Sequence, residues 1–332
     1  MNRLKIVVVC GAALLIAAAV VVASRGRSRE VPLPEVPSVV PTVEVRVKAV
    51  ERKAEMVEHG EVAAMSDVVA IVCGEDVATA GRYEARNDAF RSIARRRDLA
   101  KNDVDALLVY LRRTDDAMRI ERVAALKNDV MNLLRNQEPM PEGLAETLMG
   151  MFEGNSSTHN SPTHPHPSVV LDYCIQHLGA MLDELDEKGR LRVRAVLVKA
   201  AKRTKQPYAG TALYSLAEDS RATPAQETEL KRLTLALCKP GVNNVARIAA
   251  IQLAGERGYA EALPVLRETL LGARRDAVLD TVCIGSVGLL GNADDIPILS
   301  RFSSDSRRSA AVEAAIQRIK ERAGAVNVFR QD

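Results

Sequence analysis

The sequence predicts an all-α protein, an α-solenoid of antiparallel helix pairs preceded by one N-terminal hydrophobic helix. The first observation behind this prediction is an internal repeat. The segment 245–266 returns as 278–299, with Gly255 returning as Gly288, 33 residues later. Repeat arrays typically have periods of roughly 20 to 50 residues. The second observation is composition: 47% of residues are hydrophobic but only 3% are aromatic and Trp is absent, which suits close-packed helices better than strands.

Residues 1–24 form an N-terminal segment with the pattern of a membrane anchor or a signal peptide. A short basic start is followed by residues 6–23, an uninterrupted run of apolar or small side chains. Such a run is at the short end for crossing a bilayer and long for a signal-peptide core. Both alternatives stay open, since Val21 and Ala23 would also suit cleavage before Ser24.

Residues 25–81 are predicted to be a Pro-rich stalk and a weakly structured region. The stretch 30–42 contains four prolines, which remove backbone donors and favour an extended chain. Residues 43–50 alternate Val with charge, so they form either one strand or a continuation of the stalk. A short helix is expected near 52–65.

From residue 82 the pattern is helical, and the solenoid is predicted to cover 82–323, with a tail at 324–332. A first helix starts near Tyr83, and Asn102 or Asp103 caps a second. A third and a fourth helix are expected over 119–135 and 142–152. The segment 153–167 is polar, Pro-rich and aperiodic, so it is a loop insertion; its histidines have no Cys or carboxylate beside them to complete a metal site.

The later repeats can be superposed as two neighbouring columns of side chains. A column of small residues comprises Cys174, Ala212, Ala250, Cys283 and Ala315. The next column is aliphatic and comprises Ile175, Leu213, Ile251, Ile284 and Ile316. A small side chain admits the neighbouring helix and a branched one fills the groove, so these columns predict helix packing and carry no chemistry. The glycines of the repeat, among them Gly255 and Gly288, are predicted to be helix C-caps.

The region 245–319, with its spaced Ala-Ala-Ile, Gly and Ala-Leu-Pro elements, resembles HEAT repeats of the short bacterial kind. The resemblance is weaker over 168–240 and rests only on paired helices over 82–152. It implies a stack of antiparallel helix pairs that serves as a binding or scaffolding surface. It does not imply a reaction, because a fold alone cannot supply one.

Charge and motifs exclude several classes of function. The net charge of +3 lies entirely in residues 1–42, so the remainder is neutral, which argues against duplex binding. No phosphate-binding Gly-rich loop, GxSxG or HExxH motif occurs.

The scattered cysteines are expected to be small buried hydrophobes. His177 is expected at a helix surface or core edge. No catalytic residue, cofactor or metal site is predicted.

One basic segment, residues 188–205, is the candidate binding site. It holds eight basic residues and no acidic one. On a helix, five of them fall on one face, and we call these five the basic ridge: Lys188, Arg192, Lys199, Lys202 and Arg203. The ridge could bind phosphate, anionic lipid or an acidic peptide. Alternatively, it is a solvated face balanced by the acidic residues just upstream, between 183 and 187.

The sequence thus predicts a membrane-tethered, non-enzymatic scaffold that binds an unidentified protein or peptide. The membrane contact is residues 6–23, in a single pass with the body periplasmic or extracytoplasmic, or secreted if the leader is cleaved. The alternative is binding of nucleic acid or an anionic surface through the basic ridge. A lyase-type enzyme, as among pigment-attaching relatives of these repeats, is a third interpretation without a convergent polar site to support it.

Overall fold

The computed structural model describes residues 65–75, 78–114, 118–154, 167–273 and 276–328. These residues form α-helices joined by turns and two short 3-10 helices, and they include no β-strand. The prediction of an all-α protein is therefore confirmed for the described part of the chain. The leader 6–23, the stretch 30–42, segment 43–50 and most of the loop 153–167 lie outside the described residues.

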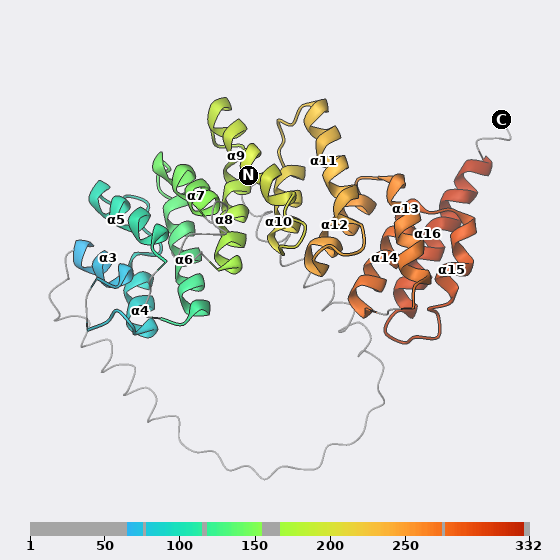
Figure 1. Ribbon diagram of the computed structural model, residues 1–332, viewed down its shortest axis with the longest axis horizontal. Coiled ribbons are helices and arrows are strands. Elements are labelled where there is room, and N and C mark those ends of the chain that lie inside the picture. The colour runs from blue at the N-terminus through green and yellow to red at the C-terminus, as the bar shows by residue number, and fades with distance from the viewer. Residues whose placement is uncertain (1–64, 76–77, 115–117, 155–166, 274–275, 329–332) are drawn as a thin grey trace, which may run out of the picture. The chain divides into compact units, whose positions relative to one another are not determined.

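The helices follow one another through the described residues with short connections (Figure 1). Their bounds are α3 (Met65–Cys73), α4 (Tyr83–Ile93), α5 (Lys101–Arg112), α6 (Ile120–Arg135), α7 (Gly143–Gly154), α8 (Ser168–Met181), α9 (Glu187–Ala201), α10 (Tyr208–Ala217), α11 (Pro224–Leu237), α12 (Asn244–Glu256), η1 (Ala260–Ala262), α13 (Leu263–Leu271), α14 (Ala277–Leu290), η2 (Ala293–Asp295), α15 (Ile296–Ser300) and α16 (Ser309–Val328).

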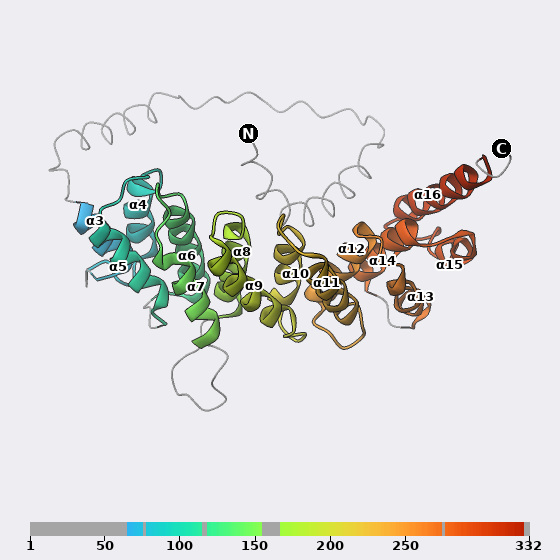
Figure 2. The same cartoon turned by 90° about the horizontal axis from the view of Figure 1, so that it is seen from above.

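Packing is regular from α6 onward. Helices α6, α8, α10, α12, α14 and α16 each contact the next member of this series. The intervening helices α7, α9, α11, α13 and α15 pack against their neighbours in the series and lie on one side of it (Figure 2). Every helix thus buries its apolar face mainly against helices close to it in the sequence.

Caps fix where several of these helices begin. The Asn243 side chain accepts from the amides of Val245 and Ala246 at the start of α12. Asp276 does the same for the start of α14. Thr223 and Gln226 form a reciprocal capping box at the start of α11, where Pro224 is the first helical residue. These side chains satisfy amides that a helix N-terminus leaves unpaired.

The predicted packing columns are confirmed. All five residues of the small column are fully buried, as are the first four of the aliphatic column. The last aliphatic residue, Ile316 on α16, is partly buried and packs against the core. The cysteines of the described residues are all buried and unpaired, as expected for small hydrophobes.

Two repeat glycines have a different role from the predicted one. Gly255 and Gly288 lie inside α12 and α14, so the prediction that they are C-caps is wrong. A Cβ at Gly255 would lie 2.9 Å from Oγ of Ser286, and one at Gly288 would lie 2.7 Å from Cα of Ala315. Both glycines therefore let the next helix of the series approach closely. Gly291, in contrast, is the C-cap of α14.

Buried cations tie successive helices together. Nε of Arg86 on α4 donates to the carbonyl of Val72 in the last turn of α3 at 3.0 Å. Nζ of Lys127 on α6 donates to the carbonyl of Leu111 on α5 at 2.8 Å. Nε of Arg247 on α12 donates to the carbonyl of Cys238 at the end of α11 at 2.8 Å. The last carbonyls of a helix have no partner within the helix, and they form the negative end of the helix dipole. A buried cation placed there donates hydrogen bonds to these carbonyls and interacts favourably with the dipole.

Several predicted boundaries differ from the observed ones. Helix α3 lies inside the region predicted as stalk and weakly structured, and it packs on α4 and α5. Asn102 and Asp103 do not cap the second helix, because α5 begins at Lys101 with Ala100 at its N-cap. Helix α16 continues to Val328, into the predicted tail. Packing against α4 and α5 accounts for α3, whereas the start of α5 differs from the prediction by only one or two residues.

Among the helices that the structure describes, none combines the length and the apolar character needed to cross a membrane.

Candidate functional site

Helix α9 carries the predicted basic ridge. Its N-cap, Asp186, accepts a hydrogen bond from the amide of Gly189 at 2.7 Å, which starts the helix at Glu187. The apolar face of α9 is buried and comprises Val193, Val196, Leu197 and Ala200. Lys202 is the C-cap of α9, so Arg203 lies just beyond the helix.

Three residues of the basic ridge contact α7. Arg192 forms an ion pair with Glu146, and Nζ of Lys199 lies 3.7 Å from a carboxylate oxygen of Glu153. Arg203 stacks on the Phe152 ring, 4.4 Å from its centroid, and donates to the Tyr208 hydroxyl at 3.0 Å. The acidic side chains that balance the ridge therefore come from α7.

The other two ridge residues, Lys188 and Lys202, are exposed at opposite ends of α9. The acidic residues upstream, expected to balance the ridge, have other roles. Asp186 is the N-cap and Glu187 pairs with Arg190, one turn along the same helix. The ridge is thus a solvated face with partners on a neighbouring helix, and the structure does not gather its five cations around one point.

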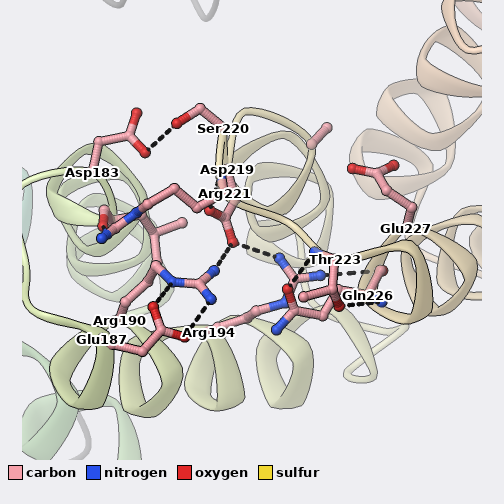
Figure 3. A network of polar contacts seen from close by, with 12 residues as sticks. Asp183, Glu187, Arg190, Arg194, Asp219, Ser220, Arg221, Thr223, Gln226 and Glu227 are labelled. Atoms are coloured by element: carbon pink, nitrogen blue, oxygen red, sulfur yellow. Dashed lines mark hydrogen bonds and ion pairs between the residues drawn. The ribbon is translucent and has the colours of Figure 1, made fainter.

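The two arginines of this segment outside the ridge form a buried cluster that the sequence analysis missed. Nη1 of Arg190 and Nη1 of Arg194 both donate to Oδ2 of Asp219, at 2.8 and 2.9 Å (Figure 3). The Asp219 side chain is 0% exposed, and those of Arg190 and Arg194 are 3% and 5% exposed. Asp219 follows α10, so the cluster joins α9 to the α10–α11 turn.

Further contacts satisfy the rest of the cluster. Glu187 accepts from Nε and Nη2 of Arg190, and this hydrogen bonding holds the pKa of the exposed Glu187 carboxyl below its usual value. Nη2 of Arg194 donates to the carbonyl of Gln226 at 3.1 Å.

Arg221 adds two contacts around the buried carboxylate. Its backbone amide donates to Oδ1 of Asp219 at 3.2 Å, and the Arg221 guanidinium donates to the carbonyl of Leu185 at 3.1 Å. A fully buried carboxylate held by two guanidiniums is a structural anchor between helices.

A signal for this cluster exists in the sequence. Arg190 and Arg194 are four residues apart and share a helix face with the buried Val193 and Leu197. Two arginines on an apolar face require buried acceptors, either a carboxylate or backbone carbonyls, because an unpaired buried charge is strongly unfavourable. The spacing predicts that such acceptors exist but not that Asp219 supplies them.

His177 on α8 is buried rather than at the helix surface. Its Nε2 lies 3.1 Å from Oδ1 of Asn128 on α6. Burial, with a smaller contribution from the charge of Arg135, lowers the pKa of His177 to about 3. The imidazole is therefore neutral at physiological pH and contributes to the contact between α6 and α8.

Comparisons with protein-family models, curated proteins and solved structures find no match to this chain.

Proposed function

We propose that this chain is a membrane-tethered, non-enzymatic scaffold that binds a protein or peptide on the surface of a HEAT-like α-solenoid. The observation that carries this proposal is the recurring contact between successive helices of the series α8 to α16. Five residues after the small-column residue of their helices, Gly179 lies against Ser215, Gly255 against Ser286 and Gly288 against Ala315. A glycine that brings the next helix of the series close, at the same repeat position in α8, α12 and α14, is what a solenoid of similar units requires.

The same periodicity extends to positions on the surface of these helices. Two residues after each small-column residue, the helices present Gln176, Tyr214, Gln252, Gly285 and Gln317, all of which are at least partly exposed. Gln252 donates to Glu256 at 3.2 Å, and Gln317 donates to Glu321 at 2.9 Å, so α12 and α16 repeat one surface arrangement. A repeated surface of this kind is typical of solenoids that bind extended partners.

The tether in this proposal is residues 6–23, and its support is the sequence pattern alone. A single apolar run fits one pass through a membrane. Basic residues flank it on both sides, Arg3 and Lys5 before it and Arg25, Arg27 and Arg29 after it, so charge does not select the orientation, and the proposal places the helical body outside the cytoplasm. Protease treatment of intact and permeabilised cells, with a tag at the C-terminus, tests this topology. Digestion only after the outer layer is permeabilised agrees with it, and protection until the inner membrane is lysed contradicts it.

Binding of nucleic acid or an anionic surface through the basic ridge has less support. A phosphate would have to compete with Glu146 for Arg192 and with Glu153 for Lys199. Counterion release would make such binding fall steeply with salt. Salt-sensitive retention of duplex DNA by the full chain would favour this alternative over the scaffold.

Site-specific photo-crosslinking in cells tests the scaffold directly. A photoreactive amino acid at Gln252 or Gln317 should give discrete adducts with the same partner, because both positions lie on the repeated surface. The matched control is Arg232, whose side chain is 66% exposed. It lies on α11, which is not one of the helices α8, α10, α12, α14 and α16 that carry the repeated surface. No adduct at Gln252 and Gln317, or the same adducts from Arg232, would contradict a partner bound on that surface.

A further inference from the structure

A cavity of about 450 Å³ lies between the segment that leads into α5 and the segment that leads into α7. Its walls come from residues 97–108 and 137–143. Its volume falls within the range typical of ligand pockets, roughly 300 to 1,000 Å³.

The two walls are tied together by Gln137 and Glu138. Oε1 of Gln137 accepts from the amide of Leu99, and its Nε2 donates to the carbonyl of Arg96, both at 2.9 Å. The amide of Glu138 donates to the carbonyl of Arg97 at 3.1 Å. Because these bonds hold the walls at a set separation, the cavity is formed before any ligand arrives, which lowers the cost of binding.

The least exposed part of the lining is apolar, and we call it the floor: Leu108 is buried, and Leu99, Val104 and Pro141 are partly buried. The charged residues of the lining are exposed and form its rim. The side chains of the floor offer no hydrogen bond, so the part of a ligand that enters must be apolar.

Charges of both signs surround this floor. Arg97 pairs with Glu138 at 2.7 Å, and Asp98 pairs with Arg96 at 3.1 Å. Lys101, Asp105 and Glu142 also line the cavity. The lining therefore has more acidic than basic side chains, which disfavours a phosphate-bearing ligand. A rim with donors and acceptors together matches the alternating N–H and C=O groups of a peptide backbone.

We propose that this cavity binds one large apolar side chain of an extended peptide, whose backbone meets the polar rim. The partner is a peptide or protein segment with a Leu, Met or aromatic residue as its anchor. This inference rests on the proposed scaffold function and adds to it a second contact with the partner, at α5 and α7 and apart from the repeated surface of α8 to α16. An anchor side chain in a desolvated pocket is where binding energy concentrates in protein interfaces.

The test uses the full chain and a random peptide library displayed on phage, followed by affinity measurement on synthetic copies of the enriched peptides. Val104→Trp fills the cavity from α5, and Gly143→Leu fills it from α7, where a new Cβ would meet only the flexible Leu108 side chain at 3.3 Å. The control is Val265→Trp, a change at another partly buried valine, on α13 and away from the cavity. Thermal unfolding followed by circular dichroism identifies the variants that fold.

The expected result is a set of peptides that share one large apolar residue and bind at least about tenfold more weakly to whichever cavity-filling variant folds. Their affinity for Val265→Trp should stay within about twofold of the original. Enriched peptides that bind the cavity-filling variants as well as the unchanged protein would overturn this inference and leave the scaffold standing. No enrichment over a resin without protein would count against both.

Discussion

Gly288 of α14 lies so close to α16 that a Cβ at position 288 would stand 2.7 Å from both Cα and Cβ of Ala315. Real Cβ atoms essentially never approach backbone atoms this closely, so only glycine permits the observed contact. Gly285, one turn earlier in the same helix, has nothing within 4 Å of the equivalent point.

These two glycines make a matched pair for a stability measurement. Gly288→Val should lower the free energy of unfolding by about 1–3 kcal/mol, since it forces α14 and α16 apart. Gly285→Ala should raise it by roughly 0.5–1 kcal/mol, because Ala loses less backbone entropy in a helix. Urea unfolding followed by circular dichroism gives both values. Equal effects of the two changes would contradict the close packing of α14 on α16.

Asp219 should be essential for the stability of the α9–α11 region. Asp219→Asn removes the charge that two buried guanidiniums share, and leaving a buried charge without its partner costs about 3–5 kcal/mol. The control is Asp183→Asn, an exposed carboxylate that accepts only a hydrogen bond from Ser220; its effect should stay within about 0.5 kcal/mol. Chemical denaturation of both variants measures this difference, and a mild effect at Asp219 would show that the cluster tolerates solvent.

Arg247 should stabilise the junction between α11 and α12. Its Nε donates to the carbonyl of Cys238, and its Nη2 donates to Oγ1 of Thr269 at 2.5 Å. Arg247→Met keeps most of the side-chain volume but leaves these acceptors unpaired, so we expect a loss of about 1–3 kcal/mol. Arg232→Met, at an exposed arginine of α11, should change stability by less than about 0.5 kcal/mol. Hydrogen exchange of the α11 and α12 amides would locate the effect.

His177 should make the protein less stable in mild acid. Its pKa is lowered to about 3 in the folded protein, against 6.5 for the unperturbed group. Between these values the unfolded chain binds a proton that the folded chain does not, so stability falls as the pH drops below 6.5. Between pH 7 and pH 5 this one group should account for a loss of about 2 kcal/mol.

The measurement compares the unchanged protein with His177→Gln, a side chain that can still bond Asn128 but does not titrate. The difference in unfolding free energy between the two should shrink by that amount between pH 7 and pH 5, whatever other groups contribute. A difference that stays constant with pH would mean that His177 is solvated when charged.

The buried cysteines should resist alkylation in the folded protein. Burial raises the pKa of the Cys174 and Cys283 thiols to about 12, and the thiolate is the reactive form. Mass spectrometry after iodoacetamide treatment at neutral pH should find these two cysteines unmodified in the native chain and modified in denaturant. Modification of Cys283 under native conditions would indicate local opening of α14.

The repeat made much of the helical packing predictable. The columns headed by Cys174 and Ile175 recur along the chain, and a side chain's place on its helix follows from sequence spacing alone. Local signals failed where packing outweighs local preference: α3 forms in a weakly patterned stretch, and Gly255 and Gly288 have the spacing of caps but lie within helices.

The sequence by itself determined that the described chain is helical and which side chains form its repeated core, because both follow from residue spacing within each helix. Only the tertiary structure decided the partners of the basic residues. Arg192 meets Glu146 across 46 residues of sequence, while Arg194 meets Asp219 across 25. Whether a cation faces solvent, an acid or a helix end depends on which helices lie beside it. The cavity between 97–108 and 137–143 likewise exists only because α5 and α7 pack side by side.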